Sequence, residues 1–110
     1  MKQGFRLSKP ADFKRVRRLG KSYTHPFLVL VVLANELAQV RVGVTAGRTV
    51  GGAVQRNRAK RVLRAAIQPL LERIAPGHDL LLIARPGVGE AGSPQTQDAL
   101  ARLLQRAKLV

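Results

Sequence analysis

The sequence predicts a single α+β domain that spans residues 1–110 and is built on a mixed sheet. Residues 27–33, and residues 79–84 after the initial Asp79, are short apolar runs rich in branched side chains, which is typical of strands buried on both faces. Residues 40–45 alternate apolar and polar side chains, which is strand periodicity. A helical pattern at 53–74 separates the strand at 40–45 from the strand at 79–84, so a crossover unit is expected.

The N-terminal part is predicted to begin with a helix over residues 9–19. Ser8 is the expected N-cap, Asp12 suits the positive end of the helix dipole, and Gly20 supplies a stop. Phe13 belongs to the apolar stripe of this helix. The opposite side is basic and carries Lys14, Arg15, Arg17 and Arg18.

Two strands are expected next. A short edge strand at 22–24 is separated by Pro26 from the central strand at 27–33. A turn at 35–38 then leads to the strand at 40–45, so the central strand and the strand at 40–45 are expected to pair as a hairpin.

The C-terminal half is predicted to hold two helices around the strand at 79–84. Pro69 removes a backbone donor and should kink or divide the helix at 53–74. Residues 85–92 are expected to form a loop, and Ser93 with Pro94 should begin the last helix. The buried face of that helix is expected to carry Leu100, Leu103, Leu104 and Ala107. The element order is therefore αβββαβα.

Composition indicates a partner with many negative charges. The chain has 20 Lys and Arg against 6 Asp and Glu, a net charge of +14, and enough apolar residues (45%) for a core. Such a charge disfavours the compact state unless a polyanion neutralises it. No apolar run reaches the length of a membrane span, so nucleic acid is favoured and no membrane partner is expected. The absence of cysteine and of an apolar secretory segment after Met1 fits a cytoplasmic protein.

The most informative segment is Arg56–Arg64, which lies in a stretch without acidic residues between Glu36 and Glu72. At helical spacing, one side of this segment gathers Asn57, Lys60, Arg61 and Arg64, and another side gathers Ala59, Leu63, Ala66 and Leu70. Solvated helix faces normally mix charges, because like charges at i,i+4 repel. The segment is therefore predicted to lie along a phosphate backbone.

Two classes of enzyme are disfavoured. Gly47 and Gly52 are spaced like the glycines of a phosphate-binding loop, but Ala53 and Val54 replace the lysine and hydroxyl that bind nucleotide and magnesium. The carboxylates form no local pair suited to a nuclease or to acid–base catalysis, and the two histidines lie far apart. Any catalysis is expected to reside in a partner.

Five segments resemble the protein subunit of bacterial ribonuclease P, and the resemblance covers about residues 6–106. They are Asp12–Val16, Gly20, Arg41–Thr45, Gly52–Arg61 and Asp79–Arg85. The most specific is the Gly-x-Ala-Val-x-Arg-Asn-Arg-x-Lys-Arg signature, which runs from Gly51 to Arg61. The resemblance implies an αβββαβα sandwich like the second domain of ribosomal protein S5, with a left-handed crossover where the general rule predicts a right-handed one.

The resemblance also implies a function. In the family, a catalytic RNA subunit uses magnesium to remove the 5′ leader from precursor tRNA, and the protein binds that RNA and the leader without a cofactor of its own. The implied RNA contacts are Arg48, Arg56, Asn57, Arg58, Lys60, Arg61 and Arg64. Arg58 ranks lowest because it falls off the main basic side of the helix.

The family's leader cleft lies between the first helix and the sheet and is lined with aromatic side chains. The implied cleft residues are Phe13, Arg17, Tyr23 and Phe27. Arg17 and Val31 stand where aromatic residues are frequent, so Arg17 is expected to contribute a cation–π or phosphate contact in place of stacking. Phe13 fits a role in the core equally well.

Two alternatives remain. The first is another protein that binds structured RNA or the ribosome and shares the fold; only the signature around Arg56–Arg58 separates it from the ribonuclease P reading. The second is a helix-turn-helix DNA-binding module, which the strands disfavour.

Overall fold

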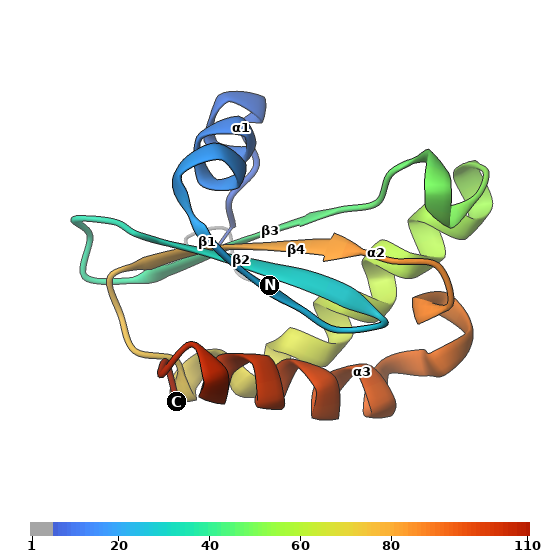
Figure 1. Ribbon diagram of the computed structural model, residues 1–110. Coiled ribbons are helices and arrows are strands. Elements are labelled where there is room, and N and C mark those ends of the chain that lie inside the picture. The colour runs from blue at the N-terminus through green and yellow to red at the C-terminus, as the bar shows by residue number, and fades with distance from the viewer. Residues whose placement is uncertain (1–5) are drawn as a thin grey trace.

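The computed structural model describes residues 6–110, which form three layers (Figure 1). The expectation that no apolar secretory segment follows Met1 concerns residues that lie partly outside this range. One helix, α1, covers one face of a four-stranded sheet, and α2 and α3 cover the other. In chain order the elements are α1 (Pro10–Leu19), β1 (Lys21–Thr24), β2 (Leu28–Ala34), β3 (Val40–Thr45), η2 (Arg48–Val50), α2 (Ala53–Ile67), η3 (Gln68–Arg73), β4 (His78–Ala84) and α3 (Val88–Arg106). The predicted αβββαβα order is confirmed.

The sheet has the strand order β1-β2-β4-β3, so the expected hairpin between β2 and β3 is wrong. β4 lies between them, antiparallel to β2 and parallel to β3. The reason is burial. Leu80, Leu81 and Leu82 are buried completely, and a strand with a neighbour on each side and a layer on each face buries such side chains better than an edge strand does. The β2–β3 connection crosses the start of β4, where Asn35 donates its backbone N–H to the carbonyl of Gly77.

The crossover from β3 through α2 to β4 is left-handed. Both strands run from left to right in Figure 1, β4 lies nearer the viewer, and α2 returns below the sheet. This is the uncommon hand that the family resemblance implies.

The sheet separates two apolar layers. The layer under α2 and α3 contains most of the core, including Leu63, Leu82 and Leu100. The layer under α1 is small, and its buried members are Leu7, Val16, Val31 and Leu81. Val16 is the one buried residue of α1, so this helix rests on the sheet through a narrow contact.

Helix ends differ from the sequence predictions in two places. Lys9 is the N-cap of α1 and no side chain caps that end, so the predicted role of Ser8 is wrong. α3 begins at Val88 with one turn, and Gly92 (φ 79°) introduces a kink before the main part of the helix. The division of the basic helix at Pro69 is confirmed, because α2 ends and the 3₁₀ segment η3 follows.

Candidate nucleic-acid interface

α2 holds its basic side chains outward because its other side is fixed in the core. Ala59, Leu63, Ala66 and Ile67 are buried completely against the sheet and α3. Asn57 and Arg61 are exposed, and Lys60 and Arg64 are half-buried. The stem of a half-buried Lys or Arg packs on the protein while its charged end stays in water. The amphipathic helix predicted from the sequence is confirmed.

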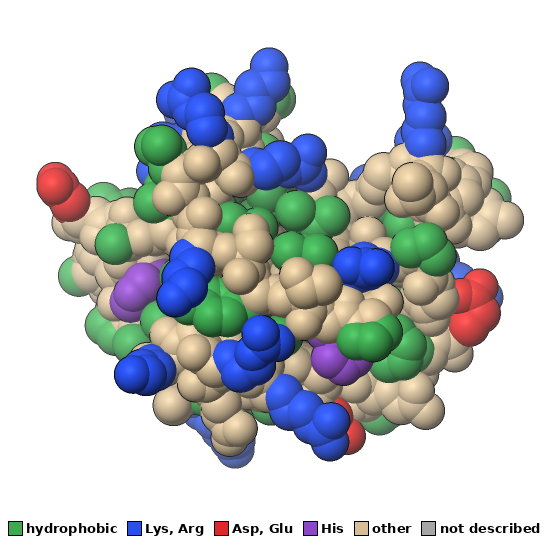
Figure 2. Space-filling view, in the orientation of Figure 1, with side chains coloured by type: hydrophobic (Ala, Val, Ile, Leu, Met, Phe, Trp, Pro, Cys, Tyr) green, Lys and Arg blue, Asp and Glu red, His purple; other side chains and the backbone are tan. Residues whose placement is uncertain are grey.

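The cationic groups of α2 have no acidic partner among residues 6–110. The ion pairs of this range involve Arg15 and Arg41 alone, which contact Asp12 and Asp79. Lys and Arg side chains gather over α1 and over other parts of the visible face in Figure 2, whereas acidic groups appear only at isolated points. The surface therefore offers cations to an external polyanion.

Arg48 and Arg58 lie apart from the main basic side of α2. Arg48 is exposed in η2, which precedes the helix. Arg58 extends toward the start of α3, where a Cβ added to Gly89 would lie 3.5 Å from its Cδ. Arg58 lines a cavity of about 190 Å³ together with Val54 and Glu90. The helical wheel had already separated Arg58 from Asn57, Lys60, Arg61 and Arg64.

A cleft lies between α1 and β3, and it brings Phe13 and Arg17 together as predicted. It has a volume of about 270 Å³, and its lining is Ser8, Pro10, Phe13, Lys14, Arg17 and Thr45. The ring of Phe13 lies directly over Gly43, since a Cβ at that position would be 2.6 Å from the ring. Because Gly43 has no side chain, the ring of Phe13 can pack directly on the backbone of β3. Phe13 both packs on the small apolar layer and lines the cleft.

Tyr23 and Phe27 do not line this cleft, so their grouping with Phe13 is wrong. Side chains alternate between the two faces of a strand, and Tyr23 pairs with Leu30, which belongs to the layer under α2 and α3. Phe27 packs against the same layer. Tyr23 instead meets the end of α3, where the guanidinium of Arg106 lies 5.9 Å from the ring centre.

Asp79 forms a buried anchor that the sequence analysis missed. Its carboxylate accepts hydrogen bonds from Arg41 (2.9 and 2.8 Å), from Arg15 on α1 (2.8 Å) and from Asn35 (2.7 Å). The side chain is completely buried, and Arg15 also contacts Asp12 at 3.2 Å. α1 is thereby tied to β3, β4 and the turn after β2.

The pKa of Asp79 lies below its ordinary value. Burial by itself raises this pKa, but the hydrogen bonds from Arg41, Asn35 and Arg15 stabilise the carboxylate and outweigh burial. The signal available in the sequence was a single carboxylate at the start of an otherwise apolar strand, together with an arginine inside the strand at 40–45. A buried charge of this kind requires a partner.

Comparison with known proteins decides the family. The family model for ribonuclease P matches residues 1–108.

The chain belongs to the ribonuclease P protein family.

Relatives agree with this assignment. The chain is 42% identical to a ribonuclease P protein component of Herpetosiphon aurantiacus, over 99% of this chain and 89% of the relative. It is 41% identical to the component of Chloroflexus aurantiacus, over 100% of this chain and 82% of the relative. Membership of this family implies association with the RNA of ribonuclease P, the holoenzyme that processes tRNA.

Solved structures show the same fold. The ribonuclease P protein of Staphylococcus aureus superimposes with a TM-score of 0.82 and 30% identity, covering 96% of each chain. The Thermotoga maritima protein gives 0.79 and 28%, covering 92% of this chain and 96% of that one. Across residues 6–110, no helix is long and apolar enough to cross a membrane, and no three His, Asp or Glu side chains come together as metal ligands.

Proposed function

We propose that this ribonuclease P protein binds the catalytic RNA through the basic side of α2 and binds the 5′ leader of precursor tRNA in the cleft between α1 and β3. The RNA subunit carries out the cleavage with magnesium, and the protein supplies affinity for the substrate. We place the protein in the cytoplasm, together with the RNA that it binds. No membrane partner enters the proposal.

The unpaired cations of α2 carry the first half of the proposal. Lys60, Arg61 and Arg64 share one side of a helix whose other side is fixed in the core, and none of them has an acidic partner in the described chain. Guanidinium groups form forked hydrogen bonds with phosphates, and a rigid helix presents several of them at a constant spacing. Arg56 and Asn57 extend the same surface toward the start of α2.

The shape of the α1 cleft supports the second half. One wall offers the ring of Phe13, and Lys14 and Arg17 add positive charge. An aromatic ring beside cations suits single-stranded nucleic acid, because bases stack on the ring while phosphates meet the charges. A duplex would not bring its bases to the ring, so an unpaired leader fits the cleft better than the tRNA body.

The RNA surface is tested by salt dependence. The affinity of the protein for the catalytic RNA is measured at several salt concentrations. In Arg61→Ala, the slope of log affinity against log salt should be smaller in magnitude by about one, because one phosphate contact is lost. Its thermal midpoint should stay close to that of the unchanged protein, since Arg61 is exposed. Arg102→Ala is a matched control, because Arg102 is an exposed arginine on α3. Equal slopes for the Arg61 and Arg102 variants would contradict the assignment of α2.

The leader cleft is tested by crosslinking within the reconstituted holoenzyme. Photoreactive groups at residues 13 and 17 should label nucleotides upstream of the cleavage site. The same group at residue 23 or 27 serves as the control, because these residues lie toward the opposite face of the sheet. Labels from residues 13 and 17 confined to the mature tRNA body would rule out leader binding in this cleft.

A further inference from the structure

The segment before α1 runs beside the free edge of β3. Arg6 forms a parallel bridge with Val42, and the N–H of Leu7 donates to the carbonyl of Val42 at 2.8 Å. Leu7 is buried in the small layer under α1. Since neighbouring side chains of an extended segment point in opposite directions, Arg6 points toward the α2 side of the edge.

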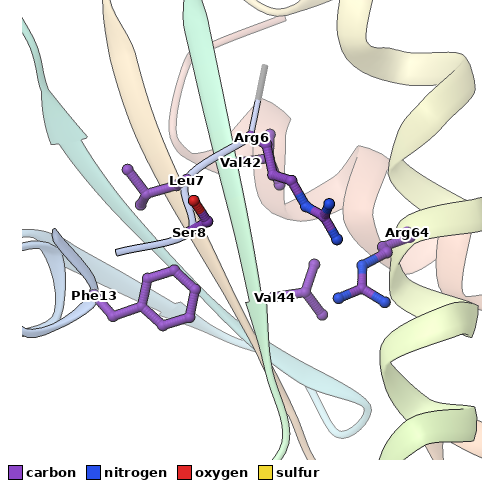
Figure 3. A pocket seen from close by; sticks show the side chains of 7 residues that line it. All are labelled: Arg6, Leu7, Ser8, Phe13, Val42, Val44 and Arg64. Carbon is purple, nitrogen blue, oxygen red and sulfur yellow. The ribbon is translucent and has the colours of Figure 1, made fainter. Parts of the chain in front are cut away.

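Arg64 approaches the same place from α2. The close-up in Figure 3 shows the guanidinium groups of Arg6 and Arg64 turned toward each other beside Val44, with Phe13 and Leu7 on the other side of β3. These residues line one pocket of about 160 Å³ that straddles the strand. Phe13 also lines the α1 cleft, so the pocket and the cleft adjoin.

The converging arginines lack a counter-ion within the described chain. Neither Arg6 nor Arg64 takes part in an ion pair. Elsewhere in the same protein, Arg15 and Arg41 also converge, but they do so on the carboxylate of Asp79. Two guanidinium groups repel each other unless an anion lies between them, and a phosphodiester accepts hydrogen bonds from both.

We propose that Arg6 and Arg64 clamp a single phosphodiester of the 5′ leader at the point where the strand passes over the edge of β3. The leader would then run from the ring of Phe13 to the edge of the basic side of α2, and one phosphate would be held from both sides of the sheet edge. In this arrangement Arg64 serves the leader, and Lys60 and Arg61 remain for the catalytic RNA. This clamp rests on the proposed function, since it requires leader in the α1 cleft. It also gives a binding role to Arg6, which the sequence analysis did not single out.

The test uses the holoenzyme reconstituted with its RNA subunit and precursor tRNAs that carry one neutral methylphosphonate at successive leader positions. The unchanged protein should lose about tenfold in affinity at one position, because charge-assisted hydrogen bonds to one phosphate are removed. That penalty should disappear in Arg6→Gln and equally in Arg64→Gln. Glutamine keeps an uncharged polar side chain, and Arg102→Gln is the control that should retain the penalty.

A double-mutant cycle provides the second measurement. The loss of affinity in the double variant should be smaller than the product of the two single losses, because both side chains hold the same phosphate. Independent losses, or penalties at different leader positions for the two variants, would overturn the clamp. So would a leader without any sensitive position. If any of these results is found while the crosslinks from residue 13 and the salt effect of Arg61→Ala persist, the clamp fails and the proposed function stands.

Discussion

The two faces of the sheet are stabilised in different ways. Under α2 and α3, a continuous apolar core joins both helices to β2, β3 and β4. Under α1, a small apolar layer is supplemented by the buried carboxylate of Asp79 and its two arginines. The first face buries most of the apolar side chains and is therefore expected to supply most of the hydrophobic stabilisation. The second face fixes the orientation of one helix and leaves a cleft open beside it.

This difference shows how a small basic protein can be stable and keep an open binding surface. Filling the α1 cleft with apolar side chains would strengthen the fold but would exclude the ligand. A charged anchor acts in a specified direction, so it sets where α1 lies without covering the sheet. The predictions that follow test this contrast, and the largest expected effect comes first.

Leu81 and Leu82 are adjacent in β4 and face opposite layers, so they compare the two faces directly. Both are buried completely. Leu82→Ala should lower the free energy of unfolding by about 4 kcal/mol, and Leu81→Ala by about 2 kcal/mol, because α1 can move toward the smaller cavity. Denaturant unfolding of the two variants measures this difference. Equal losses would show that the layer under α1 is as rigid as the main core.

Asp79→Ala should remove the anchor of α1. We expect a loss of about 2 kcal/mol in the free energy of unfolding, since Arg15 and Arg41 lose their partner but remain partly exposed to water. Amide hydrogen exchange should rise in α1 more than in α2. An exchange pattern that rises evenly across both helices would contradict a local role for the anchor.

The same carboxyl makes stability depend on pH in acid. The folded-state pKa of Asp79 is lowered, so its contribution is complete above the unfolded pKa, near 3.8, and is lost as pH falls through the folded value. Asp79→Asn cannot titrate and should show a flatter decline in stability below about pH 4 than the unchanged protein. Unfolding curves measured from pH 5 downward give the comparison. Parallel declines would show that other carboxyls account for the acid sensitivity.

Gly43→Ala should disturb the cleft more than the fold. The added methyl group would meet the ring of Phe13 at 2.6 Å and the carbonyl of Leu7 at 3.0 Å, so the ring must move. We expect a loss of about 1 kcal/mol in stability. The affinity of the reconstituted holoenzyme for precursor tRNA should fall several-fold, while its affinity for tRNA without a leader should not change. Equal losses for both RNAs would show that the ring of Phe13 does not contact the leader.

The sequence predicted the elements well because their signals are local. The apolar strand segments, the basic helix and its interruption at Pro69 all follow from periodicity and backbone chemistry. The position of β4 between β2 and β3 was missed, because strand order depends on burial that accumulates across the whole sheet. Short connections favour hairpins, and here the complete burial of Leu80–Leu82 outweighed that preference.

The candidate site divides in the same way. Side chains on α2 were placed correctly, since a helix fixes the relation between residues a few positions apart. On α1, Arg15 was assigned to the basic side opposite the apolar stripe, but its side chain turns to the buried carboxylate of Asp79. Tyr23 and Phe27 were assigned to the wrong face because the register of β1 on β2 is not visible in the sequence. The convergence of Arg15 and Arg41 on Asp79 joins distant segments, and a single sequence gives no measure of such contacts.

The central place of β4 has a consequence for protein synthesis. Residues 78–84 leave the ribosome after β1, β2, β3 and the whole of α2, yet β3 can join the sheet only through β4. Until then, Gly43 in β3 cannot lie under the ring of Phe13, and α2 has no complete sheet to pack against. A nascent chain that ends before β4 therefore carries the full basic helix without a framework to present it. The sheet that positions the basic helix is therefore complete only after residue 84 of 110 has been made.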